Sequence, residues 1–99
     1  MQYNENGEFE WDDIKAESNF KKHQVRFGEA MTVWSDSEGW EIPDHAHAVG
    51  SEERWILMGY SDKGRVLVVV YCEKYAGDVV RIISARPATG IEQKQYHLR

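Results

Sequence analysis

The sequence predicts an α+β fold, in which an antiparallel sheet of three to four strands carries two N-terminal helices and one C-terminal helix. Two observations lead to this prediction. Between Glu52 and Arg86, runs rich in Val, Ile, Leu, Tyr and Trp alternate with spacers that hold Gly and Asp, the composition of strands and tight turns. Before and after this stretch, apolar residues are spaced among charged residues as in helices.

The strand-like runs lie close together in the chain. They are Glu52–Tyr60, Arg65–Glu73 and Val79–Arg86. The spacers between them hold four and five residues, whereas a parallel crossover needs about a dozen or more. The runs are therefore expected to pair as an antiparallel three-stranded meander.

Alternation of side chains along a strand predicts which residues share a face. On the first run, one face carries Arg54, Ile56, Met58 and Tyr60, and the other carries Trp55, Leu57 and Gly59. On the second run, one face carries Leu67, Val69, Tyr71 and Glu73, and the other carries Val66, Val68, Val70 and Cys72. On the third run, one face carries Val80, Ile82, Ser84 and Arg86, and the other carries Val79, Arg81, Ile83 and Ala85. Neither face is cleanly polar. Helices are therefore expected to cover one face and to leave the other partly open.

The N-terminal half favours two helices. Phe9–Trp11 alternates as a short edge strand would, or serves as a staple for the helix that follows. Asp12 is a good N-cap, and Asp13–His23 carries its acids first and its bases last, as the helix dipole favours. A second, short helix is expected at Gly28–Trp34, although Arg26 is a poor residue to begin it.

The remaining segments are a long loop and a last helix. Ser35–Ser51 is punctuated by Gly and Pro and is expected to be irregular. Pro87 should end the third strand, and Thr89 can cap a helix over Gly90–Arg99. The apolar stripe of this helix is thin, so its stability should depend on docking.

Length, composition and net charge limit the classes of protein to which this chain could belong. The 99 residues are expected to form one domain, 1–99, and neither the polar N-terminus nor any apolar run looks like a signal peptide or a membrane span, so a soluble cytoplasmic protein is expected. A single cysteine, Cys72, excludes an intramolecular disulfide and is expected to be buried. The net charge of −5 means that RNA binding would need a local basic patch or a basic partner.

Several segments together carry a family likeness. They are FEWD (Phe9–Asp12) with Lys15 and Asn19, KKHQVRFGEA (Lys21–Ala30), EERWILMGYS (Glu52–Ser61), GRVLVVVY (Gly64–Tyr71) and RIISARPAT (Arg81–Thr89), with Asp44 and His45 before Glu52. In this order and spacing the chain resembles the BrnT toxins, the ribonuclease toxins of bacterial type II toxin–antitoxin systems, which have a RelE-like fold.

The resemblance implies an activity and a partner. It implies a toxin that inhibits translation by metal-independent cleavage of RNA, as an endoribonuclease without a cofactor, with a 2′,3′-cyclic phosphate as the expected product. It also implies neutralisation by a BrnA-type antitoxin protein, which binds DNA and represses its own operon. One assembly that it allows is a toxin–antitoxin heterotetramer.

Metal-free RNA cleavage needs a base for the ribose 2′-OH, cations for the phosphorane and an acid for the leaving 5′-oxygen. Arginine binds phosphate through two parallel hydrogen bonds, and imidazole exchanges protons near neutral pH. The resulting catalytic candidates are His23, Arg54, Arg81 and Arg86, and the RNA-binding candidates are Lys22, Arg65, Tyr71 and Ser84. Glu53 is a weaker candidate for proton transfer.

Each candidate also has a structural explanation. His23 could simply complement a helix dipole, Arg54 could pair with Glu73 across strands, and Arg81 could belong to an internal ion pair. Zinc binding by Asp44, His45 and His47 is a further alternative, but no second ligand cluster accompanies them, and no metal site is predicted.

Two functions other than cleavage stay open. A toxin-fold protein with weak or lost catalysis could act by binding its antitoxin. A related toxin could instead bind a protein target of the DNA gyrase type.

Overall fold

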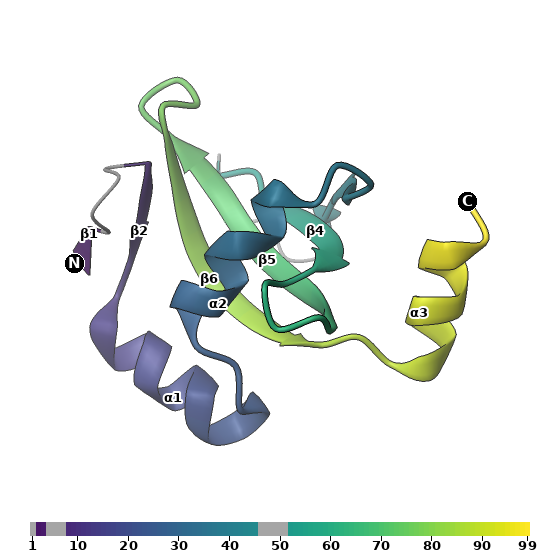
Figure 1. The fold of residues 1–99 in the computed structure, drawn as a ribbon. Coiled ribbons are helices and arrows are strands. Elements are labelled where there is room, and N and C mark those ends of the chain that lie inside the picture. Colours follow the sequence, from purple (N-terminus) through teal and green to yellow (C-terminus); the bar gives the residue numbers. More distant parts are fainter. Residues whose placement is uncertain (1, 4–7, 46–51) are drawn as a thin grey trace.

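The computed structural model describes residues 2–3, 8–45 and 52–99, which form a mixed six-stranded sheet with helices packed across one face (Figure 1). The strands lie in the order β1-β2-β6-β5-β4-β3. Their bounds are Gln2–Tyr3 (β1), Phe9–Trp11 (β2), Trp40–Pro43 (β3), Trp55–Tyr60 (β4), Val66–Lys74 (β5) and Val79–Pro87 (β6). The predicted meander is confirmed, because β4 pairs with β5 and β5 with β6, both antiparallel.

The predicted extent and character of the sheet are wrong at both ends. Strand β2 pairs in parallel with β6, with Phe9 opposite Val80, so the sheet is mixed and not purely antiparallel. Strand β3 lies within the segment expected to be irregular and pairs with β4. Proline at its end and largely exposed side chains are typical of an edge strand, which lacks the clear alternation on which sequence interpretation depends.

The helices confirm part of the prediction. α1 spans Asp13–His23 as expected, with Asp12 accepting from the backbone N–H of Ile14 and Lys15. The second expected helix divides into α2 (Phe27–Met31) and a 3₁₀ helix η1 (Thr32–Ser35). The divide falls at β-branched Thr32, whose hydroxyl donates to the carbonyl oxygen of Glu29 at 2.6 Å and so competes with α-helical geometry.

The last helix is shorter than expected and lies at the end of the sheet. α3 spans Gly90–His97 and begins with a capping box between Thr89 and Glu92. Tyr96 is its one buried residue. Across the described residues, no helix is long and apolar enough to cross a membrane.

A β-bulge in β6 changes the predicted faces. Val70 pairs with Ser84, but Tyr71 pairs with Ile82, so Ile83 is an extra residue without a partner on β5. The alternation therefore shifts by one position, and Ile82 faces the helices together with Ala85. The prediction that Arg81 and Arg86 lie on opposite faces is wrong, because the bulge brings both to the face away from α1 and α2.

The main core lies between the sheet and the helices. Its buried members are Phe9, Val25, Phe27, Ala30, Val33, Leu57, Leu67, Val69, Tyr71, Ile82 and Ala85. Trp34 lies between the rings of Phe9 and Tyr71, with edge-to-face contacts at 5.1 and 4.9 Å. A smaller cluster on the opposite face holds Met58, Val66, Val68, Ala88 and Tyr96, and docks α3 over part of that face.

Asn19 closes the edge of β6 that β2 leaves unpaired. Its side-chain oxygen accepts from the N–H of Ala85 at 3.1 Å, and its amide nitrogen donates to the carbonyl oxygens of Ala85 and Val25 at 2.9 and 3.0 Å. One buried side chain thus replaces a neighbouring strand and also holds the connector between α1 and α2.

Replacing Asn19 with Ala should lower the free energy of unfolding by about 2–4 kcal/mol, because it leaves buried backbone groups of Ala85 and Val25 without partners. Urea unfolding measures the change. Ser18→Ala, at the exposed neighbouring position on the same helix, is the matched control and should change little. Equal stability of the two variants would show that the hydrogen bonds of Asn19 to the edge of β6 do not stabilise the fold.

Candidate active site

A hollow of about 260 Å³ opens on the sheet face away from α1 and α2. Its lining residues are Asp44, Arg54, Ile56, Val68, Val70, Ile83, Ser84 and Arg86. Aliphatic side chains of the three central strands thus meet two arginines, a serine and an aspartate. The bulged residue Ile83 contributes to this lining, so the irregularity in β6 shapes the hollow itself.

Arg54 enters the hollow just before β4 begins. It forms an ion pair with Glu52, whose Oε1 lies 3.6 Å from the Arg54 Nε; the cross-strand partner considered for it, Glu73, is not its ion-pair partner. The Nε is buried without a hydrogen-bond partner. Because buried donors are rarely left unpaired, this nitrogen is a feature that an anionic ligand could satisfy.

Arg81 lies further along the same face. Its Nη1 is 3.7 Å from the Oε1 of Glu10 on β2, a carboxylate with 3% of its side chain exposed. Cys72, opposite Arg81 on β5, is fully buried as predicted, and burial raises the pKa of its thiol. The thiol is therefore not activated as a nucleophile.

Arg86 lies at the rim of the hollow and is held by α3. Its Nη1 and Nη2 donate to the two carboxylate oxygens of Glu92 at 2.7 and 2.8 Å. These hydrogen bonds lower the pKa of the Glu92 carboxyl to about 2. The pair is partly open to solvent, since 40% of the arginine side chain and 24% of the glutamate side chain are exposed.

Of the predicted RNA-binding residues, Tyr71 lies outside the hollow and Ser84 lies in its lining. Tyr71 is 1% exposed and belongs to the core under the helices, where its hydroxyl donates to Glu41. Its predicted contact with RNA does not fit this position, since the side chain faces away from the open sheet face. Ser84, in contrast, lines the hollow as the prediction requires.

Arg65 also lies on the helix side of the sheet. It donates to the buried Glu29 carboxylate through Nε and Nη2, at 2.8 and 2.6 Å, and to the carbonyl oxygen of Gln24 at 2.9 Å. Its hydrogen bond lowers the pKa of the Glu29 carboxyl. These contacts tie the start of β5 to α2, so its position indicates a structural role.

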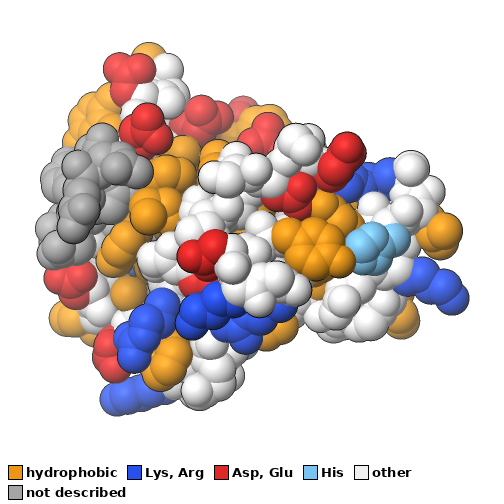
Figure 2. Space-filling view, viewed as in Figure 1, with side chains coloured by type: hydrophobic (Ala, Val, Ile, Leu, Met, Phe, Trp, Pro, Cys, Tyr) orange, Lys and Arg blue, Asp and Glu red, His pale blue; other side chains and the backbone are white. Residues whose placement is uncertain are grey.

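Lys22 and His23 end α1, outside the lining of the hollow. β2 runs parallel to β6 and Asn19 reaches Ala85, so α1 advances in the direction of β6. His23, half-buried and one turn beyond Asn19 on the same helix face, is therefore expected near the strand end that carries Arg86. Figure 2 shows Lys and Arg side chains gathered at the lower edge of the helix-covered face.

Of the three residues considered for zinc binding, Asp44 and His45 are described, and His47 lies outside the described residues. Asp44 is buried and borders the hollow, and His45 is exposed. Within residues 2–3, 8–45 and 52–99, no three His, Cys, Asp or Glu side chains are grouped so that they could hold a metal ion. Glu53, the weaker proton-transfer candidate, is exposed and lies outside this hollow.

The sequence matches a family model described as the ribonuclease toxin BrnT of type II toxin–antitoxin systems, over residues 11–92. The chain belongs to the BrnT family. The family resemblance predicted from the sequence is thereby confirmed, and a type II system implies an antitoxin protein as partner. No curated protein sequence matches the chain.

The fold agrees with that of a solved BrnT. The 1.1 Å crystal structure of the Brucella abortus ribonuclease toxin BrnT matches with a TM-score of 0.62 and 20% sequence identity, over 80% of this chain and 92% of that chain. The α+β fold is therefore that of BrnT.

Sequence reasoning missed the carboxylates that hold the arginines. Thr89 and Glu92 have the spacing of a capping box, so the role of Glu92 at the helix start could have been read from the sequence. Its pairing with Arg86, six positions earlier, follows from no local rule. Glu29 and Glu10 reach their arginines only through tertiary contacts.

Replacing Arg65 with Ala should lower the free energy of unfolding by about 2–3 kcal/mol, because it leaves the Glu29 carboxylate buried without its guanidinium. The value is below that of a fully buried pair since 37% of the Arg65 side chain is exposed. Urea unfolding measures it, with the exposed Lys63→Ala of the same turn as control. A loss of RNA cleavage at unchanged stability would instead support the RNA-binding role predicted from the sequence.

The Arg86–Glu92 pair predicts a dependence of stability on pH. Since the folded-state pKa of Glu92 lies below its ordinary value of 4.5, the pair stabilises the fold above pH 4.5 and less as the pH falls towards 2. Glu92→Gln should cost about 1 kcal/mol at pH 7, after allowance for solvent exposure. Urea unfolding at pH 7 and pH 3 should show the difference between wild type and variant shrinking; a constant difference would exclude the ion pair as its source.

Proposed function

We propose that this BrnT-family toxin is a metal-independent endoribonuclease and that the scissile phosphate binds at the hollow between Arg54 and Arg86. The observation that carries the proposal is the grouping of Arg54, Arg81 and Arg86 on one sheet face, with a buried Arg54 Nε that lacks a hydrogen-bond partner. Arginines on strands are held rigidly, which suits the stabilisation of charge that develops in the transition state.

The proposed reaction is an internal transesterification of RNA. The ribose 2′-oxygen bonds to phosphorus while the bond from phosphorus to the 5′-oxygen breaks, which leaves a 2′,3′-cyclic phosphate and a 5′-hydroxyl end. A base removes the proton of the 2′-OH, and an acid delivers a proton to the departing 5′-oxygen. Arg54 and Arg86 would neutralise the non-bridging oxygens of the phosphorane.

His23 is the proposed proton-transfer residue. It is half-buried at the end of α1, on the helix face that meets the free edge of β6, and imidazole suits proton transfer near neutral pH. Ser84 would donate a hydrogen bond to the phosphate from the wall of the hollow. Arg81 and the exposed Lys22 would contact neighbouring parts of the RNA backbone.

A BrnA-type antitoxin is the proposed partner of the chain. The type II family implies an antitoxin protein, and the net charge of −5 favours pairing with a basic protein, as a DNA-binding antitoxin would be. Pairing of two toxins with two antitoxins is the proposed assembly.

Purified protein should cleave single-stranded RNA in the presence of EDTA. Arg54→Ala and Arg86→Ala should each lower the cleavage rate by about tenfold or more, because each removes a cation from the transition state, and His23→Ala should lower it by about a hundredfold. Gel analysis of labelled RNA gives the rates, and end-group analysis identifies the cyclic phosphate.

Lys94→Ala on the exposed side of α3 is the matched control for loss of a positive charge and should keep the wild-type rate. Equal cleavage rates in Arg54→Ala, Arg86→Ala and the control would show that the proposed site is wrong. No cleavage by the folded wild type would instead favour a protein-binding role, which co-purification with the antitoxin would test.

A further inference from the structure

The Glu92 carboxylate accepts hydrogen bonds from the two terminal nitrogens of Arg86, which a phosphate could otherwise bind. A guanidinium binds a phosphate through two parallel N–H donors, as it binds a carboxylate. Both terminal nitrogens of Arg86 are already engaged by the two Glu92 oxygens, at 2.7 and 2.8 Å, and Nη1 also donates to the carbonyl oxygen of Pro87 at 3.3 Å. RNA that reaches the hollow therefore meets a guanidinium whose two terminal nitrogens already donate to a carboxylate.

The capping box holds Glu92 in this position. Its Oε1 accepts from the N–H of Thr89 at 2.8 Å, and the Thr89 hydroxyl accepts from the N–H of Glu92 at 3.2 Å. The same carboxylate thus begins α3 and neutralises Arg86. Its low pKa, about 2, keeps it charged at every physiological pH, so protonation does not release Arg86.

We propose that Glu92 is a built-in competitor for the RNA phosphate and that α3 is a latch, which must release Arg86 before RNA can bind its two terminal nitrogens together. The inference rests on the proposed function in taking the hollow as the phosphate site. It adds that the resting chain is partly autoinhibited by its own C-terminal helix.

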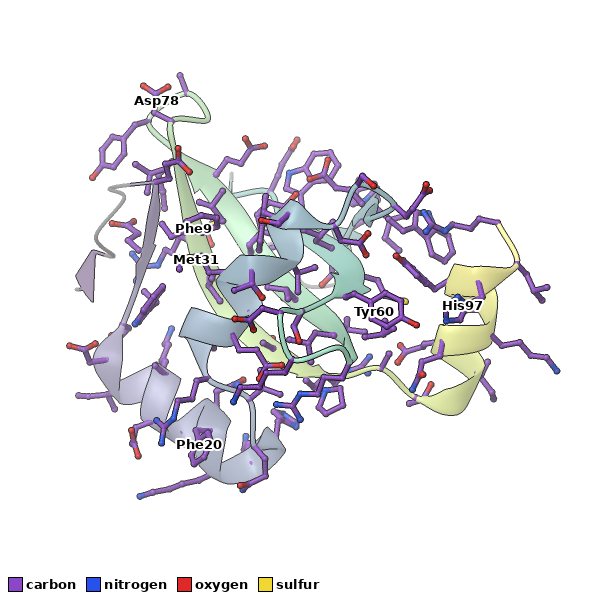
Figure 3. All side chains as sticks on the ribbon, in the orientation of Figure 1. Phe9, Phe20, Met31, Tyr60, Asp78 and His97 are labelled. Atoms are coloured by element: carbon purple, nitrogen blue, oxygen red, sulfur yellow. The ribbon has the colours of Figure 1, made fainter. Side chains whose placement is uncertain are left out.

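The attachment of α3 suits a latch. Beyond Glu92, Tyr96 holds the helix by packing in the smaller cluster and against the Tyr60 ring, and its hydroxyl donates to Asp36. The Tyr60 hydroxyl also lies 3.1 Å from the His97 Nε2, and Arg99, which follows the helix, donates to the carbonyl oxygen of Glu38 and lies over the Trp40 ring. Figure 3 shows Tyr60 and His97 facing one another across the gap between β4 and α3.

Other features of α3 agree with easy release. Ile91 and Leu98 remain 73% and 76% exposed, so the apolar docking of α3 depends on Tyr96, its one buried residue, and elements with few buried contacts open at low cost in free energy.

The test uses Glu92→Gln, which removes the charge but can keep the capping box, since glutamine also serves at this position. The first readout is binding of a 2′-deoxy oligonucleotide, which has phosphates but lacks the attacking hydroxyl, measured by fluorescence anisotropy at low salt. The second is single-turnover cleavage of RNA. Glu17→Gln on the exposed face of α1 is the control for the same change in net charge.

The expected result is about five- to tenfold tighter oligonucleotide binding by Glu92→Gln than by wild type or Glu17→Gln, because the phosphate no longer competes with a carboxylate. Cleavage at low RNA concentration should rise by a similar factor. Arg86→Ala/Glu92→Gln should bind no better than Arg86→Ala, because the gain requires the arginine.

Unchanged or weaker binding by Glu92→Gln would overturn the inference, as would a gain that persists without Arg86 or that Glu17→Gln reproduces. The two proposals fail separately. Tighter oligonucleotide binding without RNA cleavage would keep the latch and remove the nuclease, whereas cleavage that needs Arg86 but ignores Glu92 would keep the nuclease and remove the latch.

Discussion

One extra residue in β6, Ile83, brings Arg81 and Arg86 to the same face of the sheet. In a regular strand, Arg81 and Arg86 would face opposite sides of the sheet, because they are five positions apart. The bulge brings both to the open face, while Ile82 and Ala85 still face the helices. The hollow, the approach of Arg86 to α3 and the proposed phosphate site all depend on this change of alternation.

Each arginine on the open face lies beside a carboxylate: Glu52 beside Arg54, Glu10 beside Arg81 and Glu92 beside Arg86. Each positive charge of these arginines is thus matched by a negative charge nearby, in a protein whose net charge is −5. A basic cleft binds RNA largely through release of counterions into solution. Here the counterions are side chains of the chain itself, so RNA binding would be an exchange of partners, and its strength would depend on how readily each carboxylate withdraws.

The parts of the fold that sequence predicted are those specified locally. Short Gly- and Asp-containing spacers determine the meander, and Asp12 determines the start of α1. The parallel pairing of β2 with β6, the edge strand β3 and the bulge depend on contacts between distant residues, and no short-range pattern marks them. The same division holds at the site. Arg54, Ser84 and Arg86 border one hollow because the meander places β4 and β6 on the two sides of β5. In contrast, Arg65 is held by Glu29, 36 positions earlier, and the core encloses Tyr71.

The pairing of β2 with β6 also bears on when this protein can become active. Phe9 lies opposite Val80, so β2, which also pairs with the two-residue strand β1, cannot join the meander until β6 has been synthesised. Contacts of such wide sequence separation form late and slowly, and strand β6 carries the arginines of the proposed site. A nascent chain therefore cannot assemble the proposed phosphate site before residues 79–87, which form β6, have emerged from the ribosome.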